Sequence, residues 1–333
     1  MDFYERDFLR ILDFTEAELQ YILSMSKQFK QIKKSGQNHK YFPTKNIAIL
    51  FEKTSTRTRC SFEVAAYDLG MGVTYLDPTG SQMGHKESIA DTARVLAKLY
   101  DGIEYRGFDQ KIVDDLAKYA DVPVWNGLTD EAHPTQALAD FMTLEEQFGK
   151  LRGLTLAFVG DTRNNVANSL MAMSARMGVN FIACGPEALR PSQEIIDKCK
   201  PIAERSRSTI TVTSDINALN GKADAIYTDV WLSLGEDKEK WGERIKLLQP
   251  YQVNAEMINK AKPTTVFLHC LPSFHDLNTS IAREIHQKFG LKEMEVTNEV
   301  FESSRSIVFR QAENRMHTIK AVMFLTLFKK EEQ

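Results

Sequence analysis

Several kinds of sequence feature are scarce in this chain of 333 residues, and each absence excludes some classes of function. The four cysteines, Cys60, Cys184, Cys199 and Cys270, lie far apart and form no C-x-x-C pair, so neither a zinc site nor a disulfide framework is indicated. No apolar run approaches the length of a membrane span, and the first residues lack the basic-then-apolar order of a signal peptide. We therefore expect a cytoplasmic protein, because unpaired cysteines suit a reducing compartment.

A large excess of charge of one sign is also lacking. Lys and Arg number 42 and Asp and Glu number 45, which gives a formal net charge of −3. A chain so balanced has no general attraction to nucleic acid or to an anionic membrane, and we expect neither as a partner. The hydrophobic share of 43% and the charged share of 26% are ordinary for a globular enzyme. Any basic group that matters for function must therefore act locally.

Strand-like apolar runs alternate with amphipathic helical patterns along most of the chain. The expected strands cover residues 47–51, 73–76, 102–105, 122–125, 155–159, 181–184, 209–213, 225–228 and 265–268. Repeated strand–helix units predict parallel sheets covered on both faces. We predict an α/β fold of two doubly wound parallel-sheet domains, residues 1–150 and 151–310, with an active-site cleft between them. A last helical segment over 311–333 is expected to pack back on the first domain.

The most informative motif is the run Ser55-Thr56-Arg57-Thr58-Arg59. It follows the expected strand and precedes a helical pattern at 61–67. At such a turn the first backbone N–H groups of the helix have no partner, and the helix dipole favours negative charge. Hydroxyl and guanidinium groups at that place complete a cradle for phosphate. The same residue types also cap helices, so the run alone leaves both interpretations open.

A histidine and an amide follow the fourth expected strand, in His133-Pro134-Thr135-Gln136. Pro134 suits the first position of a helix, which places His133 and Gln136 three residues apart near its start. Such a pair can polarise a carbonyl and orient an N–H₂ group. A single histidine is more often structural than catalytic, so this motif gains weight only beside the others.

Two further motifs follow expected strands in the second half of the chain. Asn165 ends the turn at 160–165, where its amide can face a ligand, although this turn is not the G-x-G-x-x-G of a dinucleotide site. Asp229 begins the segment 229–236 and can bind an ammonium group or cap a helix.

The remaining candidates are a cysteine and a distant arginine. Cys270, in His269-Cys270-Leu271-Pro272, is a nucleophile or simply a buried cysteine. If the strand continues through it, its side chain points away from that of His269, which then cannot serve as its base. Arg315, near the start of the last helix, can reach a cleft from the far end of the chain, although a solvated surface arginine is the simpler interpretation of this residue alone.

In this order, and over nearly the whole chain, these motifs resemble those of the aspartate/ornithine carbamoyltransferase family. The S-T-R-T-R run and the H-P-T-Q motif resemble the family's carbamoyl-phosphate signatures. The H-C-L-P motif resembles the ornithine branch, because the aspartate branch has no cysteine there. The segment from Asp229 to Gly235 resembles the ornithine branch's substrate loop, except that Leu234 stands where the methionine of Ser-Met-Gly is usual. Leucine is close to methionine in volume, so we expect function to survive.

The resemblance implies transfer of the carbamoyl group of carbamoyl phosphate to the side-chain amine of L-ornithine, which gives L-citrulline and phosphate. It implies a carbamoyl-phosphate site of Ser55, Thr56, Arg57, Thr58, Gln82, Arg106, His133, Gln136, Cys270, Leu271 and Arg315. It implies an ornithine site of Asn165, Asp229, Ser233 and Leu234. Arg106, His133 and Cys270 are the implied catalytic residues. No metal or organic cofactor is implied. Gln82 matches a loop that reaches a neighbouring subunit, so a homo-oligomer is expected, either a trimer or a multiple of trimers.

Other functions remain open on the sequence alone. A carbamoyltransferase acting on putrescine would have no α-carboxylate to bind, and a nicotinamide-dependent dehydrogenase lacks its glycine motif here. A hydrolase would use Cys270 as nucleophile with His133 as base. A binding or assembly protein would not need the polar site residues. The sequence also leaves the direction open, because arginine biosynthesis and arginine degradation use the same site.

Overall fold

The computed structural model describes residues 1–77, 86–232 and 238–329, and three predicted site residues, Gln82, Ser233 and Leu234, lie outside them. The chain forms two compact units, residues 1–147 with 312–333 and residues 148–311. Each unit contains a parallel β-sheet with helices, so the predicted α/β fold class is confirmed. Among the described residues, no helix combines the length and the apolarity needed to cross a membrane.

The first unit is built around a sheet of four described strands in the order β2-β1-β3-β4. The strands are β1 (Asn46–Phe51), β2 (Gly72–Leu76), β3 (Gly102–Arg106) and β4 (Val124–Leu128), and every neighbouring pair is parallel. The middle strands β1 and β3 are buried almost throughout, as expected for a parallel sheet covered on both faces. Their packing fixes the carboxyl ends of the strands, where candidate site residues lie.

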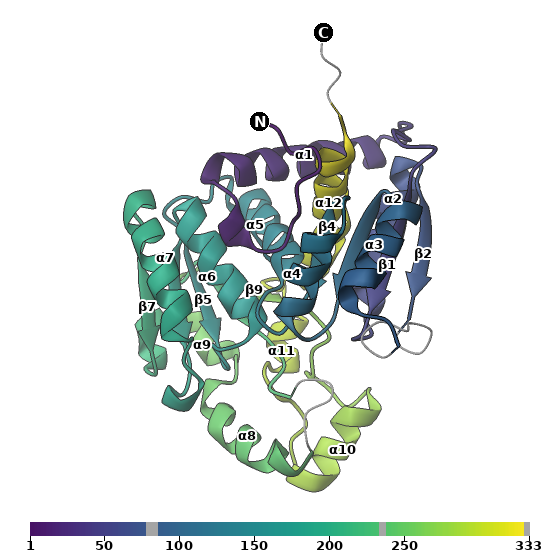
Figure 1. Ribbon diagram of the computed structural model, residues 1–333. Coiled ribbons are helices and arrows are strands. Elements are labelled where there is room, and N and C mark those ends of the chain that lie inside the picture. The colour runs from purple at the N-terminus through teal and green to yellow at the C-terminus, as the bar shows by residue number, and fades with distance from the viewer. Residues whose placement is uncertain (78–85, 233–237, 330–333) are drawn as a thin grey trace. The chain divides into compact units, whose positions relative to one another are not determined.

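Helices also belong to this unit, and only some of them connect its strands (Figure 1). They are α1 (Glu16–Lys34), α2 (Thr56–Leu69), α3 (Ile89–Leu99), α4 (Gln110–Tyr119), α5 (Pro134–Phe148) and α12 (Val308–Leu327), with a 3₁₀ turn at Ile11–Asp13. Helices α1 and α12 are joined by polar and aromatic contacts. Lys30 donates to the side-chain oxygen of Asn314 at 2.7 Å, and the rings of Phe29 and Phe324 lie 5.3 Å apart. Most of α12 therefore belongs to the first unit.

Among the element boundaries that differ from those expected, two bear on the candidate site. Helix α2 begins at Thr56 rather than near residue 61, because Ser55 caps it: the Ser55 hydroxyl accepts from the backbone N–H of Thr58 at 3.2 Å. Strand β4 covers Val124–Leu128 rather than 122–125. The polar Asn126 does not end the strand, since its amide donates to the carbonyl of Leu9 at 3.0 Å inside the unit.

The second unit contains a sheet of five described strands in the order β7-β6-β5-β8-β9. The strands are β5 (Thr155–Val159), β6 (Asn180–Cys184), β7 (Ile210–Thr213), β8 (Ala225–Thr228) and β9 (Val266–His269), again parallel throughout. The helices are α6 (Asn165–Met177), α7 (Gln193–Ser206), α8 (Trp241–Leu248), α9 (Ala255–Lys260), α10 (Ser280–Phe289) and α11 (Asn298–Phe301). Short 3₁₀ turns lie at Glu187–Leu189, Ile216–Leu219, Lys238–Lys240 and Gln249–Tyr251.

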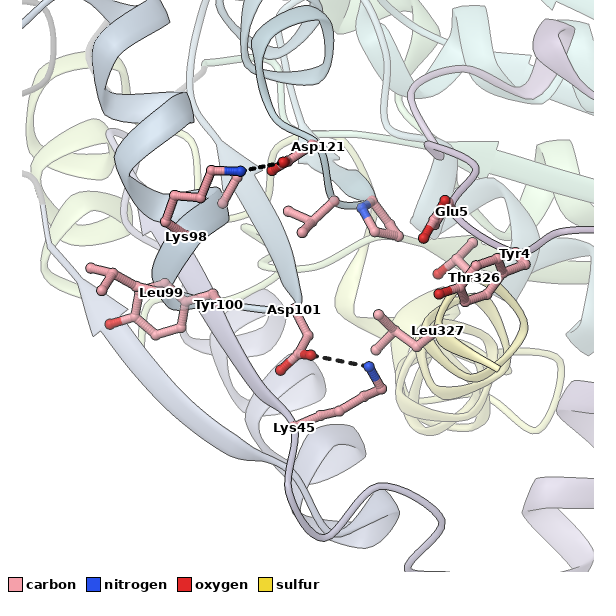
Figure 2. A pocket seen from close by; sticks show the side chains of 13 residues that line it. Tyr4, Glu5, Lys45, Lys98, Leu99, Tyr100, Asp101, Asp121, Thr326 and Leu327 are labelled. Atoms are coloured by element: carbon pink, nitrogen blue, oxygen red, sulfur yellow. Dashed lines mark hydrogen bonds and ion pairs between the residues drawn. The ribbon is translucent and has the colours of Figure 1, made fainter. Parts of the chain in front are cut away.

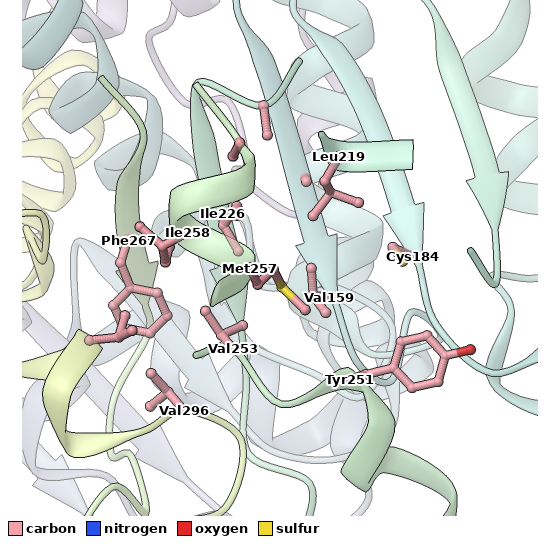
Figure 3. Close-up of a cluster of buried hydrophobic side chains, with 14 of the residues drawn as sticks. Val159, Cys184, Leu219, Ile226, Tyr251, Val253, Met257, Ile258, Phe267 and Val296 are labelled. Carbon is pink, nitrogen blue, oxygen red and sulfur yellow. The ribbon is translucent and has the colours of Figure 1, made fainter. Parts of the chain in front are cut away.

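A cluster of buried apolar side chains holds this second sheet against α9. Figure 3 shows Val159, Ile226 and Phe267 of the strands near Met257 and Ile258 of the helix. Burial of such side chains is the main favourable contribution to folding, at about 25 cal/mol per Å² of apolar surface. This core fixes strands β5, β8 and β9, whose carboxyl ends lead into the candidate residues of the second unit.

Candidate active site

In both units some of the predicted site residues lie where the strand order reverses. In the first unit that point lies between β1 and β3: the run Ser55–Arg59 follows β1, and Arg106 ends β3. In the second unit it lies between β5 and β8, and Asn165 and Asp229 follow these strands. Open parallel sheets bind ligands at the carboxyl ends of such strands, because connections that leave in opposite directions form a crevice there. Each unit therefore carries polar candidates at the place where its sheet offers a ligand site.

Two buried arginines of the first unit meet on one hydroxyl group. Arg106 of β3 and Arg315 of α12 both donate to Oγ1 of Thr58, at 3.3 Å and 3.0 Å. Their exposed fractions are 9% and 2%, and Thr58 is fully buried, so the interpretation of Arg315 as a surface residue is excluded. The Nε of Arg106 also donates to the carbonyl of Lys53 at 3.2 Å, which fixes the direction of its guanidinium. Two buried positive charges beside a helix N-terminus form a strong site for an anion.

His133 lies beside these arginines, directly before α5, and is 3% exposed. Burial lowers the pKa of its imidazole well below the usual value, and positive charges lower it further, those of Arg315, Arg106, Arg57 and Lys53. His133 is therefore neutral at physiological pH, so it meets a bound group as a hydrogen-bonding imidazole rather than as a cation. The same electrostatic effect places the guanidinium of Arg57 near the cluster.

The other residues of the run support the helix or face solvent. Ser55 caps α2, and Thr56 is its exposed first residue. Arg59 turns to a different neighbour: its guanidinium carbon lies 3.7 Å from the centre of the Tyr75 ring, and its Nε donates to Glu63 at 2.9 Å. Successive residues of a helix point in directions about 100° apart, so Arg57 and Arg59 cannot serve the same surface.

Gln136 lies near the start of α5 and is 1% exposed. Its Nε2 donates to Oδ1 of Asp140 at 2.7 Å, one turn further along the helix. Among the described residues, nothing donates a hydrogen bond to Oε1 of Gln136. A buried acceptor without a partner is costly, so this oxygen is suited to receive an N–H group from a ligand.

A buried acid lies on the same face of β3 as Arg106. Glu104 precedes that arginine by two residues and is fully buried. Gly127 of β4 makes room for it, since a Cβ at that position would come within 1.9 Å of Oε1 of Glu104. Burial raises the pKa of the Glu104 carboxyl well above its usual range, and the charges of Arg106 and Arg315 oppose this only in part. Because burial favours the neutral form of this carboxyl, it takes up less of the positive charge of the two arginines, which stays available to an anion.

In the second unit, Asp229 connects two other chain segments. Its Oδ1 accepts from Sγ of Cys270 at 3.0 Å, and its Oδ2 accepts from Nδ2 of Asn164 at 3.1 Å. Asn164 also caps α6 by accepting from the N–H of Ala167 at 2.7 Å, which makes Asn165 the first residue of that helix. Asp229 itself is partly exposed and continues from β8 without opening a helix. A carboxylate held in this way can bind an ammonium group.

Cys270 lies on a turn rather than on a continued strand. Strand β9 ends at His269, and Leu271 has a φ of 58°, a left-handed conformation that is unusual for leucine. The N–H of Leu271 donates to Nδ1 of His269 at 2.8 Å, and Nε2 of His269 lies 3.3 Å from Oε1 of the buried Glu295. The imidazole is thus occupied by other groups, while the thiol of Cys270 donates to Asp229. This geometry agrees with the expectation that His269 is not a base for Cys270.

Asp229, His269 and Cys270 also bring together three possible metal ligands. One carboxylate oxygen, one imidazole nitrogen and one sulfur lie within 4.8 Å of one another. These are ligand types that zinc accepts. However, Nδ1 of His269 already accepts a backbone N–H, and the thiol already donates to the carboxylate. The three groups therefore fit a hydrogen-bonded arrangement better than a coordination site.

A cavity of about 310 Å³ lies near the opposite ends of the strands in the first unit. Figure 2 shows the residues that line it, several of which directly precede β1, β3 and β4. Four of its charged side chains form ion pairs: Lys45 lies 3.0 Å from Asp101, and Lys98 is paired with Asp121. Because these charges are paired and the cavity lies away from the carboxyl ends of the strands, we assign it no substrate.

Sequence reasoning missed several side chains that support the candidate residues, namely Glu104, Asp140, Asn164 and Glu295. A charged residue within an apolar strand is a signal for Glu104, and an acid four residues after Gln136 on a helix is a signal for Asp140. Asn164 stands inside the turn already singled out. No local pattern indicates Glu295, because its partners come from a segment more than twenty residues earlier.

Comparisons with known proteins cover both units. Residues 6–146 match the family described as "Aspartate/ornithine carbamoyltransferase, carbamoyl-P binding domain", and residues 152–326 match "Aspartate/ornithine carbamoyltransferase, Asp/Orn binding domain". The catabolic ornithine carbamoyltransferase of Treponema denticola is 60% identical over 322 residues, which cover 97% of this chain and 95% of the relative. The catabolic ornithine carbamoyltransferase 1 of Staphylococcus epidermidis is 56% identical over 324 residues, covering 97% and 98%. Among solved structures, the ornithine carbamoyltransferase of Pyrococcus furiosus has a TM-score of 0.90 and 41% identity, with 98% of each chain covered.

Proposed function

The chain belongs to the aspartate/ornithine carbamoyltransferase family, and from that premise we propose that it is an ornithine carbamoyltransferase. It transfers the carbamoyl group of carbamoyl phosphate to the side-chain amine of L-ornithine and releases L-citrulline and phosphate. One observation carries the assignment of the phosphate end: two buried arginines and a helix N-terminus converge on Thr58 in the unit that matches a carbamoyl-phosphate domain. We assign residues 1–150 to carbamoyl phosphate, 151–310 to ornithine, and the segment 311–333 to the first domain.

The phosphate group binds at the start of α2. The backbone N–H groups of the first turn and the side chains of Ser55, Thr56, Arg57 and Thr58 hold it there, together with Arg106. Charge builds up on this group as it leaves, so the same contacts strengthen in the transition state. Each charged hydrogen bond contributes about 1.5–3 kcal/mol.

The carbamoyl group lies against His133 and Gln136. The tetrahedral intermediate carries an oxyanion, which Arg106, His133 and the hydroxyl of Thr58 stabilise as a preorganised set of donors. Because His133 is neutral, it contributes a hydrogen bond and does not draw the phosphate away from the arginines. The unpaired oxygen of Gln136 accepts from the carbamoyl N–H₂. Arg315, Cys270 and Leu271 complete the surroundings of this group.

Ornithine binds with its α-ammonium group at Asp229 and its α-carboxylate at Asn165. Ser233 and Leu234, which lie outside the described residues, contact its chain. A free alkyl amine has a pKa of about 10.4, so only about one molecule in a thousand is neutral and nucleophilic at pH 7. Cys270 lines the pocket beside the attacking nitrogen. The amine attacks the carbamoyl carbon directly, and no acyl-cysteine intermediate is required.

Ornithine, putrescine and aspartate, offered side by side with carbamoyl phosphate, test the acceptor. We expect a ureido product chiefly from ornithine, because only this acceptor uses Asp229 and Asn165 while matching the length of the site. If putrescine is preferred, Asp229 and Asn165 do not bind the acceptor in the proposed way. Putrescine would then replace ornithine as the proposed acceptor. Absence of any product with all three acceptors would refute the transferase activity.

We further propose that the enzyme works in arginine degradation, where it converts citrulline and phosphate into ornithine and carbamoyl phosphate. The support is that the relatives at 60% and 56% identity are named catabolic. A host strain lacking its own enzyme separates the two roles. Restored growth on arginine as an energy source is expected, whereas rescue of an arginine requirement alone would contradict this direction.

We also propose that the chain assembles as a trimer or a multiple of trimers, in the cytoplasm. Apolar side chains on α2 and α3 support a subunit interface there: Tyr67 is 55% exposed, Val95 49% and Leu99 65%. Gln82, outside the described residues, would enter the neighbouring subunit's site. Light scattering gives the assembly, and mixing inactive Gln82→Ala and Arg57→Ala subunits should restore part of the activity. A monomer with full activity would exclude the shared site.

A further inference from the structure

Two buried side chains on α5 form a pair whose orientation is fixed by its chemistry. Gln136 and Asp140 stand four residues apart, on the same face of the helix, and are 1% and 0% exposed. The amide Nε2 of Gln136 donates to Oδ1 of Asp140 at 2.7 Å. An ionised carboxylate can only accept hydrogen bonds, whereas an amide has one accepting and one donating end. Asp140 accepts from the nitrogen of Gln136, so the oxygen of that amide points elsewhere.

The other end of this amide is the informative one. Oε1 of Gln136 is buried and has no hydrogen-bond partner among the residues that the structure describes. A buried acceptor without a partner costs free energy, so its persistence requires a reason. Reversing the amide would remove that cost only by turning an N–H₂ group into the same space and would break the bond to Asp140. Reversal of the Gln136 amide therefore loses a hydrogen bond to Asp140 and gains none among the described residues.

We propose that Asp140 is a positioning residue that holds Gln136 with its oxygen toward the carbamoyl N–H₂ group, and thereby selects a carbamoyl over another acyl phosphate. This inference rests on the proposed function and deepens it. A carbamoyl group has two N–H bonds to donate, while the acetyl group of acetyl phosphate has a methyl group in that place and none. With the amide fixed, an acetyl group would leave Oε1 of Gln136 buried and unpaired, which a site built around a hydrogen bond rejects.

Asp140→Asn is the decisive substitution. It keeps the shape of the side chain at position 140 and no longer requires the nitrogen of Gln136 to face it. An asparagine at this position can accept from Gln136 or donate to it, so the amide becomes free to reverse and present its N–H₂ group to the N–H₂ of the substrate. We expect kcat/KM for carbamoyl phosphate to fall by about tenfold or more, with little change in the KM for ornithine. Acetyl phosphate should inhibit the variant more strongly, relative to carbamoyl phosphate, than it inhibits the wild type.

A double-mutant cycle separates positioning from general structural support. If Asp140 acts through Gln136, Asp140→Asn should have almost no further effect on kcat/KM in a Gln136→Ala background. If Asp140 merely supports the fold, the two losses should multiply. Ser26→Ala is a matched control, since Ser26 is also buried and donates to a helix carbonyl, at 2.7 Å, but lies on α1. We expect this control to change the melting temperature and to leave the KM for carbamoyl phosphate unchanged.

The outcomes distinguish this inference from the proposed function. A wild-type enzyme that forms no citrulline refutes the function itself. An active wild type in which Asp140→Asn keeps normal kinetics, or in which the two losses multiply, refutes only the positioning role. If the asparagine variant does not fold, Asp140→Ser is used in the same cycle, because its hydroxyl can also accept or donate. Unchanged discrimination against acetyl phosphate in a folded variant would likewise overturn the inference.

Discussion

Replacing Thr58 by valine tests the cluster of buried arginines most directly. The substitution keeps the branched shape and removes the hydroxyl that accepts from Arg106 at 3.3 Å and from Arg315 at 3.0 Å. Both guanidinium groups then lose a buried acceptor, and the oxyanion loses a donor. The phosphate cradle keeps its charges but loses the group that aligns them.

The expected loss follows from these contacts. A charged hydrogen bond contributes about 1.5–3 kcal/mol, and the bond from Arg106 is long for a full contribution. Counting one full bond and part of a second gives about 3 kcal/mol, which corresponds to a fall of roughly 150-fold in kcat/KM for carbamoyl phosphate. The KM for ornithine should change little, because Asp229 and Asn165 are untouched.

Citrulline formation at varied carbamoyl phosphate gives the answer, with Thr58→Ser as the matched control. Serine keeps the hydroxyl and loses only a methyl group, so we expect it to stay within a few fold of the wild type. Thermal melting checks that the valine variant folds. A valine variant within tenfold of the wild type, or a serine variant that loses as much activity as valine, would refute the role given to the shared hydroxyl.

Three further substitutions probe the phosphate cradle, the thiol and a buried histidine. Arg57→Ala should lose most activity even at saturating carbamoyl phosphate, with an unchanged melting temperature; near-normal turnover would refute the cradle. Cys270→Ser should lower turnover without abolishing it, and complete loss of turnover would favour the hydrolase. Burial lowers the pKa of His317 from 6.5 to about 3, so only the unfolded chain binds a proton between these values and stability falls as pH drops below 6.5. His317→Gln should therefore remove about 2 kcal/mol of the destabilisation between pH 7.5 and pH 5, measured by urea unfolding, with His286→Gln on α10 as control. An unchanged pH dependence would show that His317 is protonated in the folded state.

The order of strands and helices could be predicted from the sequence because each element has a clear periodicity and a clear end. The boundaries failed where polar residues belong to an element. Thr56 to Arg59 do not form an apolar stripe, yet they open α2, since the cap at Ser55 decides where the helix begins. Asn126 lies within β4 because a carbonyl from the distant Leu9 satisfies its amide. The first boundary depends on a local cap that the apolar pattern does not register, and the second depends on a contact 117 residues away along the chain.

Some residues of the candidate site could be predicted from local motifs, and others could not. The phosphate run, His133 and Gln136 stand in local motifs, so their residue types already indicate their chemistry. Glu104 was not predicted, because charged residues normally face water, and only the absence of a side chain at Gly127 shows where its carboxyl fits. The hydrogen-bond partners of Asp229 could not be predicted either, because Asn164 and Cys270 follow two other strands.

The contribution of α12 to the anion cluster has a consequence for how the protein is made. Arg315 follows Thr58, the residue it meets, by 257 positions, so it is synthesised much later. The strands of the first unit can pair long before synthesis ends, but the cluster holds only one of its two shared guanidinium groups until the final helix emerges. A chain released before α12 would therefore keep the strands of the first sheet and lack the second of the two charges that meet on Thr58.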